Sequence, residues 1–317
     1  MYQKAKKRTI YFIGVTTSKS SIMKVFPKWA DYLELGDVEI KGMDFKVHDE
    51  PEKYREAVNF IKYDELSLGA LVTTHKVDLL RECKDQFDEL DEYAELMDEI
   101  SCISKRDGKL IGHAKDPITS GLSLDSFIPK SYWKNTGSEV LILGAGGSGI
   151  AISWYLLKKE HGGNRPSKII VTNRSQGKID EIKKIHNSIG IDIPVEYYST
   201  LQDPDLNDRM CKLLKPGSLV INATGLGKDA PGSPFVHDKV TFPRHGIAWD
   251  FNYRGNLIFL DQAKEAKSRD KSLRIEDGWV YFIHGWTHVI SEVFDITIPT
   301  EGSVFKDLSD IAATVRQ

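Results

Sequence analysis

The chain has 317 residues, of which 40% are hydrophobic and 28% are charged, and its formal net charge is -3. This length suffices for two domains with separate cores, and the weak negative charge gives no electrostatic basis for binding nucleic acid or an anionic membrane. Cys83, Cys102 and Cys211 lie far apart and lack metal-ligand spacing. We therefore expect neither a disulfide framework nor a metal site, and the cytoplasm is the expected compartment.

The first third of the chain alternates between strand and helix patterns, which is typical of parallel strands joined by crossover helices. The pattern predicts strands at 8–16, 38–47 and 69–73, and helices at 22–34, 51–62 and 76–83. An acidic helix is expected at 88–100, and "RDGK" is the expected turn between two short strands. The interrupted alternation predicts an α/β domain whose sheet is mixed or parallel.

A second alternating series follows residues 127–139, which combine Pro, Gly, Asn and Ser without either periodicity and are interpreted as a link between domains. This series predicts strands at 139–143, 168–172, 193–198, 218–222 and 247–251, and helices at 148–160, 176–188 and 258–269. The last forty residues are expected to be mostly helical. The fold class is therefore α/β with two domains.

Residues 140–157 lack charge over 18 positions, the length at which a membrane span is suspected. Four glycines among the first ten positions argue against one continuous helix. We expect a strand, a glycine turn and a helix here.

This turn contains Gly144, Gly146 and Gly149 in the pattern GxGxxG, with Gly147 as a further small residue. Such a turn lets the backbone approach a pyrophosphate and directs helix amides at the phosphates. The pattern alone is common, but its position between a strand and a helix favours a dinucleotide site in a doubly wound Rossmann domain.

The strand after this helix ends in "VTNRSQGK", where NAD-binding folds usually place an acidic residue. Asn173, Arg174, Ser175 and Lys178 instead offer donors and two positive charges. These suit a 2′-phosphate and predict NADP; a solvated basic turn is the alternative. Thr224 follows another strand, in "VINATGLG", and is expected to line the same crevice.

In "GALVTTHKVDLL", residues 69–80, an apolar strand pattern ends in two threonines, His75 and Lys76, and a helical pattern resumes. A cation at a helix start opposes the helix dipole, so the residues alone favour a solvent-facing Lys76. His75 stays open between substrate contact and packing.

Seven segments carry a resemblance in their order and spacing: "VTTHK", "RDGKLIGHAKD", "LILGAGGSGIA", "TNRSQGK", "INATGLG", "WDFNYRG" and "FIHG". They resemble the shikimate/quinate dehydrogenase family. The resemblance implies two α/β domains with a cleft between them, the last helices returning to the first domain. It implies a substrate domain of residues 1–130 completed by 278–317, and an NADP-binding Rossmann domain of residues 131–277.

The same resemblance implies hydride transfer between NADP and a carbon bearing a hydroxyl or keto group. It assigns the catalytic pair to Lys76 and Asp116. The chemistry agrees, because loss of hydride from an alcohol requires a base for the hydroxyl proton, and the reverse reaction requires an acid.

Departures from the family pattern fall on the expected substrate contacts. Thr74 stands where a proline is expected, and Ala114 and Lys115 replace the residues before the catalytic aspartate. The expected substrate-binding residues become Ser20, Thr73, Ser101 and His284. Because a polar site rejects ligands that leave its groups unpaired, we expect the substrate to differ from shikimate.

We therefore expect an NADP-dependent oxidoreductase acting on a polyhydroxylated small molecule, a hydroxy acid or a polyol. The protein is expected to be a monomer or homodimer without nucleic-acid or membrane partners. The alternative is a regulatory protein that binds NADP(H) without catalysis. A folate-linked dehydrogenase is a third possibility, which the "RDGK" and "NRS" segments fit poorly.

Overall fold

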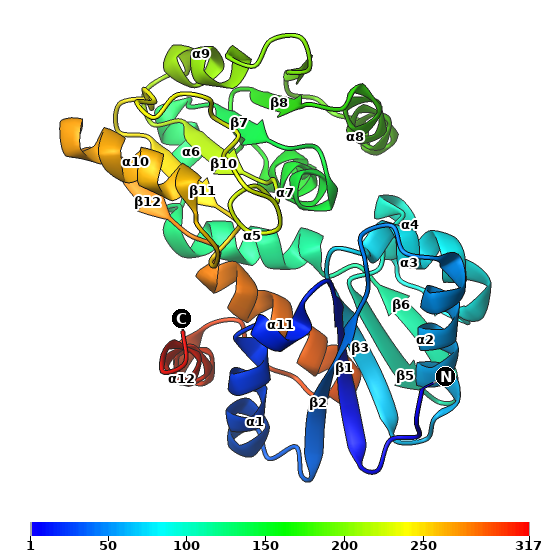
Figure 1. Ribbon diagram of the computed structural model, residues 1–317. Helices are drawn as coiled ribbons and strands as arrows, with labels where there is room; N and C mark the ends of the chain where they lie inside the picture. Colours follow the sequence, from blue (N-terminus) through cyan, green and yellow to red (C-terminus); the bar gives the residue numbers. More distant parts are fainter. Residues whose placement is uncertain (1, 317) are drawn as a thin grey trace. The chain divides into compact units, whose positions relative to one another are not determined.

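The computed structural model describes residues 2–316 (Figure 1). Contacts divide the chain into two compact units, residues 1–119 with 283–317 and residues 120–282. Each unit contains a six-stranded sheet, which confirms the two-domain α/β fold class. The functional division at residues 130 and 278 remains a prediction.

The sheet of the first unit is mixed, as expected. Its strands are β1 (Arg8–Gly14), β2 (Val38–Asp44), β3 (Ser67–Val72), β4 (Glu89–Leu90), β5 (Cys102–Arg106) and β6 (Lys109–His113). They lie in the order β2-β1-β3-β5-β6-β4. Only β5 runs antiparallel to its neighbours, so the remaining strands end at one edge of the sheet.

Helices cover both faces of this sheet. They are α1 (Ile22–Tyr32), α2 (Pro51–Tyr63), α3 (Lys76–Cys83), α4 (Glu92–Met97), α11 (Trp279–Phe294) and α12 (Gly302–Ala313), with 3₁₀ turns η1 (Thr17–Lys19) and η2 (Lys84–Gln86). Buried residues of α2, α3 and α4 form one core with the sheet. Figure 1 shows α12 beside α1, where the indole of Trp29 donates to the Leu308 carbonyl at 2.8 Å. The expected return of the last helices to the first unit is confirmed.

The acidic helix predicted at 88–100 is wrong in its extent. Glu89 and Leu90 instead form β4, which pairs with β6, and α4 begins only after Asp91. The Asp91 side chain caps this helix by accepting from the Ala94 N–H at 2.8 Å, and the left-handed Asp98 ends it.

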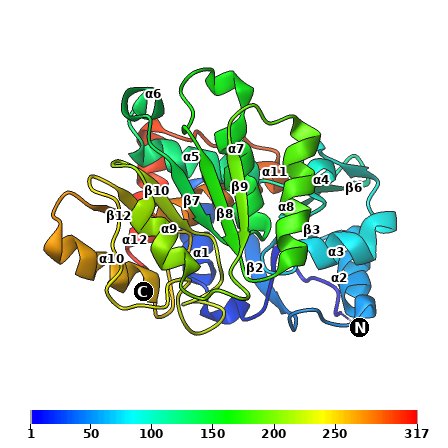
Figure 2. The same cartoon turned by 90° about the horizontal axis from the view of Figure 1, so that it is seen from above.

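The second unit has the predicted doubly wound architecture. Its strands are β7 (Val140–Leu143), β8 (Ile169–Asn173), β9 (Val195–Ser199), β10 (Leu219–Asn222), β11 (Ile247–Asp250) and β12 (Arg274–Glu276). All pairs are parallel, in the order β12-β11-β10-β7-β8-β9 (Figure 2). The order reverses between β7 and β10, at the switch point where open α/β sheets bind ligands.

The helices of this unit are α5 (Asp116–Phe127), α6 (Tyr132–Thr136), α7 (Gly147–Leu157), α8 (Gln176–Ile189), α9 (Leu206–Leu213) and α10 (Ile258–Arg269), with the 3₁₀ turn η3 (Lys159–His161). Both α5 and α11 contain a boundary between the units. The interpretation of residues 140–157 as strand, turn and helix is confirmed by β7 and α7. Within residues 2–316, none of the helices has the length and apolar composition needed to cross a bilayer.

Candidate active site

Lys76 and Asp116 form an ion pair in the first unit. Lys76 opens α3 shortly after β3 ends, and Asp116 opens α5 shortly after β6 ends. Because β3 and β6 both run antiparallel to the β5 strand between them, they end at the same edge of the sheet. The order of the strands therefore joins two side chains that lie 40 positions apart in the sequence.

Both partners are largely withdrawn from water, with side chains 17% and 10% exposed. The ammonium of Lys76 lies at a helix N-terminus, where a cation opposes the dipole, and the Asp116 carboxylate compensates for it. Asp116 is itself in the first turn of α5, where a carboxylate is favoured. The pair combines a group that can exchange a proton with a group that orients it.

Thr73 and Ser101 fix the backbone around this pair. The Thr73 carbonyl accepts from the Lys76 N–H at 3.1 Å. The Thr73 hydroxyl donates to the Ile13 carbonyl at 3.2 Å. The Ser101 hydroxyl accepts from the Lys115 N–H at 2.7 Å, next to Asp116. Both residues lie at the edge that carries the pair, while their contact with substrate remains a prediction.

His75 is a packed residue. It is 1% exposed, its ring contacts the rings of Phe45 and Tyr54, and its Nδ1 lies 3.0 Å from the Tyr54 hydroxyl. Burial lowers the pKa of His75 and so favours the neutral ring. The structure therefore answers the question that the sequence left open.

Lys115 belongs to a partly buried ionic network. Its ammonium lies 2.8 Å from Glu292 of α11 and 3.6 Å from Asp91. Glu292 also lies within 3.5 Å of the Arg106 guanidinium and 3.7 Å of His113. These neighbours hold the pKa of Glu292 below its usual range despite the opposing effect of burial. The network links α11 to the chain immediately before Asp116.

Ser20 and His284, two expected substrate contacts, are buried in the first unit with exposures of 5% and 2%. Ser20 lies between η1 and α1. The His284 ring stacks on Phe305 with centroids 4.4 Å apart. Their part in the site remains a prediction.

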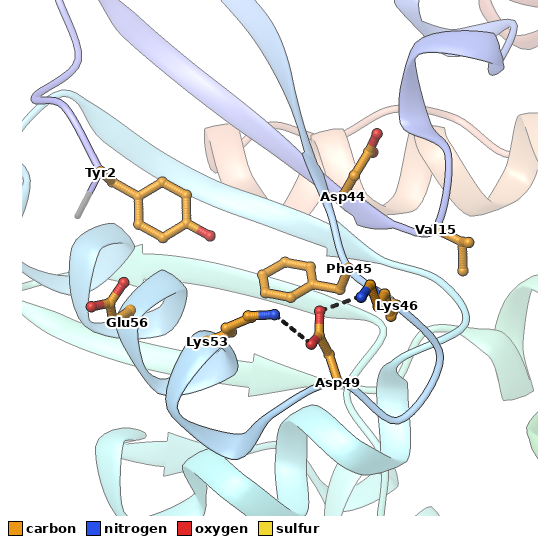
Figure 3. A pocket seen from close by; sticks show the side chains of 8 residues that line it. All are labelled: Tyr2, Val15, Asp44, Phe45, Lys46, Asp49, Lys53 and Glu56. Atoms are coloured by element: carbon orange, nitrogen blue, oxygen red, sulfur yellow. Dashed lines mark hydrogen bonds and ion pairs between the residues drawn. The ribbon is translucent and has the colours of Figure 1, made fainter.

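A separate hollow of about 400 Å³ opens at the ends of β1 and β2 (Figure 3). Figure 3 shows Asp49 at its rim, where the carboxylate accepts from the Lys46 N–H at 3.0 Å and contacts the Lys53 ammonium at 2.7 Å. Lys76 and Asp116 are absent from the residues that line it. Its paired charges give it no evident role in the proton chemistry.

The second unit carries the predicted glycine turn between β7 and α7. Gly144 has φ +116°, and a Cβ at Gly149 would lie 2.2 Å from the Gly144 carbonyl oxygen. A Cβ at Gly146 would meet no heavy atom within 4 Å, so this side of the turn is open. The turn, the open side and the N-terminus of an 11-residue helix fit a dinucleotide pyrophosphate.

Asn173 closes β8 and accepts from the Ala145 N–H at 3.3 Å, which joins this strand end to the glycine turn. Arg174 and Ser175 are exposed next to it. Lys178 pairs with Glu181 at 2.6 Å, so its ammonium must leave this carboxylate to reach a phosphate. Thr224 follows β10 and donates to the Asn222 side-chain oxygen at 2.6 Å.

Buried histidines predict instability in acid. Burial lowers the pKa of both His186 and His284 to about 4, below the ordinary value of 6.5. The unfolded chain therefore binds more protons, and stability present above pH 6.5 is lost as the pH falls toward 4. Each histidine contributes on the order of 3 kcal/mol to this loss.

Thermal unfolding followed from pH 7.5 to 4.5 measures this effect. We expect His186→Gln and His284→Gln each to reduce the acid-induced drop in melting temperature. His48→Gln is the control, because the His48 side chain is 80% exposed. An unchanged pH slope in both buried-site variants would contradict the prediction.

Comparison with known proteins finds NADP(+) shikimate dehydrogenases among the sequence relatives. No protein-family model matches the chain. It is 30% identical over 183 residues to an NADP(+) shikimate dehydrogenase of Lactococcus lactis, covering 56% of this chain and 58% of that protein. It is 28% identical over 225 residues to the Shouchella clausii enzyme of the same name, covering 69% and 72%.

The chain is thus similar in sequence to NADP(+) shikimate dehydrogenases, the first of which it matches over 58% of that protein's length. Solved structures agree with its fold. The Aquifex aeolicus shikimate dehydrogenase superposes with TM-score 0.70 at 18% identity, covering 98% of this chain and 99% of that one. A 5-ketofructose reductase of Gluconobacter superposes with TM-score 0.64 at 18% identity, covering 98% and 99%. At these identities the superpositions establish the fold alone.

Part of the polar framework was not predicted from the sequence. Glu292 and Asp91, which hold Lys115, lie on segments far apart in the sequence. Asp250 and Asn222, at the ends of adjacent strands, were also missed. The available signal for the second pair was a polar residue ending an otherwise apolar strand.

Proposed function

We propose that this protein is an NADP-dependent oxidoreductase that acts on a CH–OH group. It transfers hydride between NADP(H) and a hydroxyl-bearing or keto carbon of a polyhydroxylated, acidic small molecule other than shikimate. The Lys76–Asp116 ion pair at the edge of the first sheet carries the proposal. The three cysteines, all free and buried, suit a reducing compartment such as the cytoplasm.

The two residues would have separate roles. In the reducing direction, the Lys76 ammonium donates its proton to the carbonyl oxygen as hydride reaches the carbon. In the oxidising direction, neutral Lys76 accepts the hydroxyl proton as hydride leaves. Asp116 orients the amine in both directions and balances its charge when it is protonated.

The second unit supplies the residues that would hold the cofactor. The α7 N-terminus would face the pyrophosphate, and Gly146 leaves room for it. Arg174 and Lys178 would pair with the 2′-phosphate, where an acidic residue would favour NAD. When bound, NADP supplies the hydride acceptor, and NADPH supplies the hydride.

The residues around the pair support a substrate other than shikimate. The family resemblance implies amide side chains at the positions of Ser101 and Ala114. Both residues offer less hydrogen bonding than an amide, and Ser101 already accepts from the Lys115 N–H. The resemblance implies a glutamine where this chain has His284, whose ring is buried and whose pKa is lowered by that burial. Loss of such pairings can change preference between substrates by several orders of magnitude.

A substrate panel tests the proposal. Purified protein is assayed for NADPH oxidation and NADP reduction with cyclic and sugar hydroxy acids, uncharged polyols, ketoses and shikimate, and with NAD(H) in parallel. We expect turnover with an acidic panel member, preference for NADP(H), and little or no turnover of shikimate. NADPH binding without turnover across the panel would favour the regulatory alternative, and efficient turnover of shikimate would refute the substrate assignment.

A further inference from the structure

Two polar side chains meet at the ends of the central strands of the second sheet. Asn222 closes β10 and Asp250 closes β11, and the two residues are direct partners in the parallel register. The amide of Asn222 donates to Asp250 Oδ1 at 3.1 Å, and the same oxygen accepts from the Asn252 N–H at 2.8 Å. Asn222 and Asp250 are both fully buried.

This pair controls the loop that contains Thr224. Asn222 Oδ1 accepts from both the N–H and the hydroxyl of Thr224, at 3.1 and 2.6 Å. On the other side, the Asn252 amide donates to the carbonyls of Thr224 and Leu226, at 3.0 and 3.4 Å. Asp250 accepts from the amide nitrogen of Asn222, and this bond favours the same amide orientation as the two bonds from Thr224 to the amide oxygen.

Asp250 holds this position at a cost in stability. Among the described residues, none provides a hydrogen-bond partner for its second oxygen, Oδ2. Burial is the main cause that raises the pKa of Asp250 to about 7. The charge of Asp277 adds to this shift, and the hydrogen bonds of Asp250 oppose it. A buried carboxyl with a raised pKa at the carboxyl edge of an open α/β sheet is a candidate functional group.

We propose that Asp250 is a positioning residue for the cofactor: it orients the Asn222 amide and thereby holds Thr224 and the loop after β10 ready to receive NADP. The inference rests on the proposed function, since it assumes that this crevice binds the cofactor. Its new content is the assignment of Asp250, which acts through Asn222 rather than by contact with the ligand.

The neutral form of Asp250 suits this role better than the ionised form. If Asp250 were ionised, Oδ2 would carry a buried charge without a hydrogen-bond partner. The free energy gained by hydrating this charge would favour opening of the loop. The neighbouring elements contain the ion pairs Arg274–Glu276 on β12, Lys264–Asp261 and Arg269–Glu265 on α10, and Lys228–Asp229. Asp277, after β12, is the charged residue that adds to the raised pKa of Asp250, and Arg254 follows Asp250 in the loop after β11. Strand β10 itself carries no charged residue.

NADPH binding to the full-length protein, followed by its fluorescence, tests the proposal with two variants. Asp250→Asn keeps the Oδ1 acceptor and removes the titration. Asp250→Leu has a similar size and removes the acceptor. At pH 6 we expect Asp250→Asn to bind as the wild type does and Asp250→Leu to bind about tenfold more weakly.

The pH profile separates positioning from simple support of the fold. The ratio of the dissociation constants of wild type and Asp250→Asn should be near one at pH 6 and about ten at pH 9, because only the wild type ionises. Other titrations, including that of the cofactor phosphate, cancel in this ratio. Thermal unfolding is measured in parallel, and Asp250→Asn should melt above the wild type at pH 9, where the raised pKa has removed stability.

A ratio that stays near one overturns the inference, as does a folded Asp250→Leu that binds NADPH like the wild type. Should Asp250→Leu fail to fold, the ratio for Asp250→Asn decides. Wild-type protein that binds no NADPH at any pH refutes the proposed function together with the inference. Normal NADPH binding with a flat ratio refutes the inference alone.

Discussion

Replacing Lys76 by alanine is expected to lower hydride transfer by about 10²- to 10⁴-fold, without weakening NADPH binding. The substitution removes the group that exchanges the proton and leaves the Asp116 carboxylate without its cation. The residues proposed to bind the cofactor all lie in the other unit, so the affinity for NADPH should be unchanged. The measurement is steady-state turnover of the best panel substrate together with NADPH titration.

Lys62→Ala is the matched control for this variant. Lys62 is also a half-buried lysine in an ion pair, with its side chain 19% exposed and its ammonium 3.0 Å from Asp88. It lies in the last turn of α2 and pairs with Asp88, not with Asp116. Its loss should leave turnover unchanged. Unchanged turnover in Lys76→Ala would refute the proton-transfer role, and Asp116→Asn should reproduce most of the defect if the two residues act as a pair.

Replacing Gly149 by alanine is expected to weaken NADPH binding by at least about tenfold. The new methyl group would lie 2.2 Å from the Gly144 carbonyl oxygen, which is backbone and cannot rotate away. Such a clash typically lowers the stability of the fold by about 1–3 kcal/mol. It is relieved only if α7 moves away from the glycine turn. The helix amides would then no longer face the pyrophosphate.

The control for Gly149→Ala is Gly163→Ala in the same unit. A Cβ at Gly163 would meet no heavy atom within 4 Å, and its backbone is outside the left-handed region. We expect its NADPH affinity and melting temperature to match those of the wild type. If Gly149→Ala bound NADPH as tightly as Gly163→Ala does, the turn would not be the cofactor site.

Strongly periodic segments were predictable from the sequence. The helices at 76–83 and 258–269 have the predicted bounds, and the alternating strands differ from the structure by a few residues at their ends. In these segments the spacing of apolar residues and the need to bury them specify the same element. The glycine turn was likewise found in its expected place between β7 and α7.

Other elements depend on their neighbours. Helix α5 was not predicted, because Pro117 and Gly121 suggest a break and its apolar residues do not follow one face. A Cβ at Gly121 would meet the Tyr155 ring at 2.2 Å, so the glycine allows close packing. The link predicted at 127–139 contains the short helix α6, and α9 and the three-residue strand β12 were also missed. β12 is defined by its pairing with β11, which no local pattern reveals.

By itself, the sequence determined the α/β class and the doubly wound second sheet, because these depend on local periodicity. It also supplied the residue types proposed for proton and phosphate chemistry, and its family resemblance paired Lys76 with Asp116. Only the tertiary structure showed how strand ends bring Lys76 to Asp116, bury His75 against Phe45 and set Asp250 beside Asn222. Each of these contacts depends on which strands are neighbours and where they end. Strand order arises from packing of the whole sheet, so residues distant in sequence become partners only in the fold.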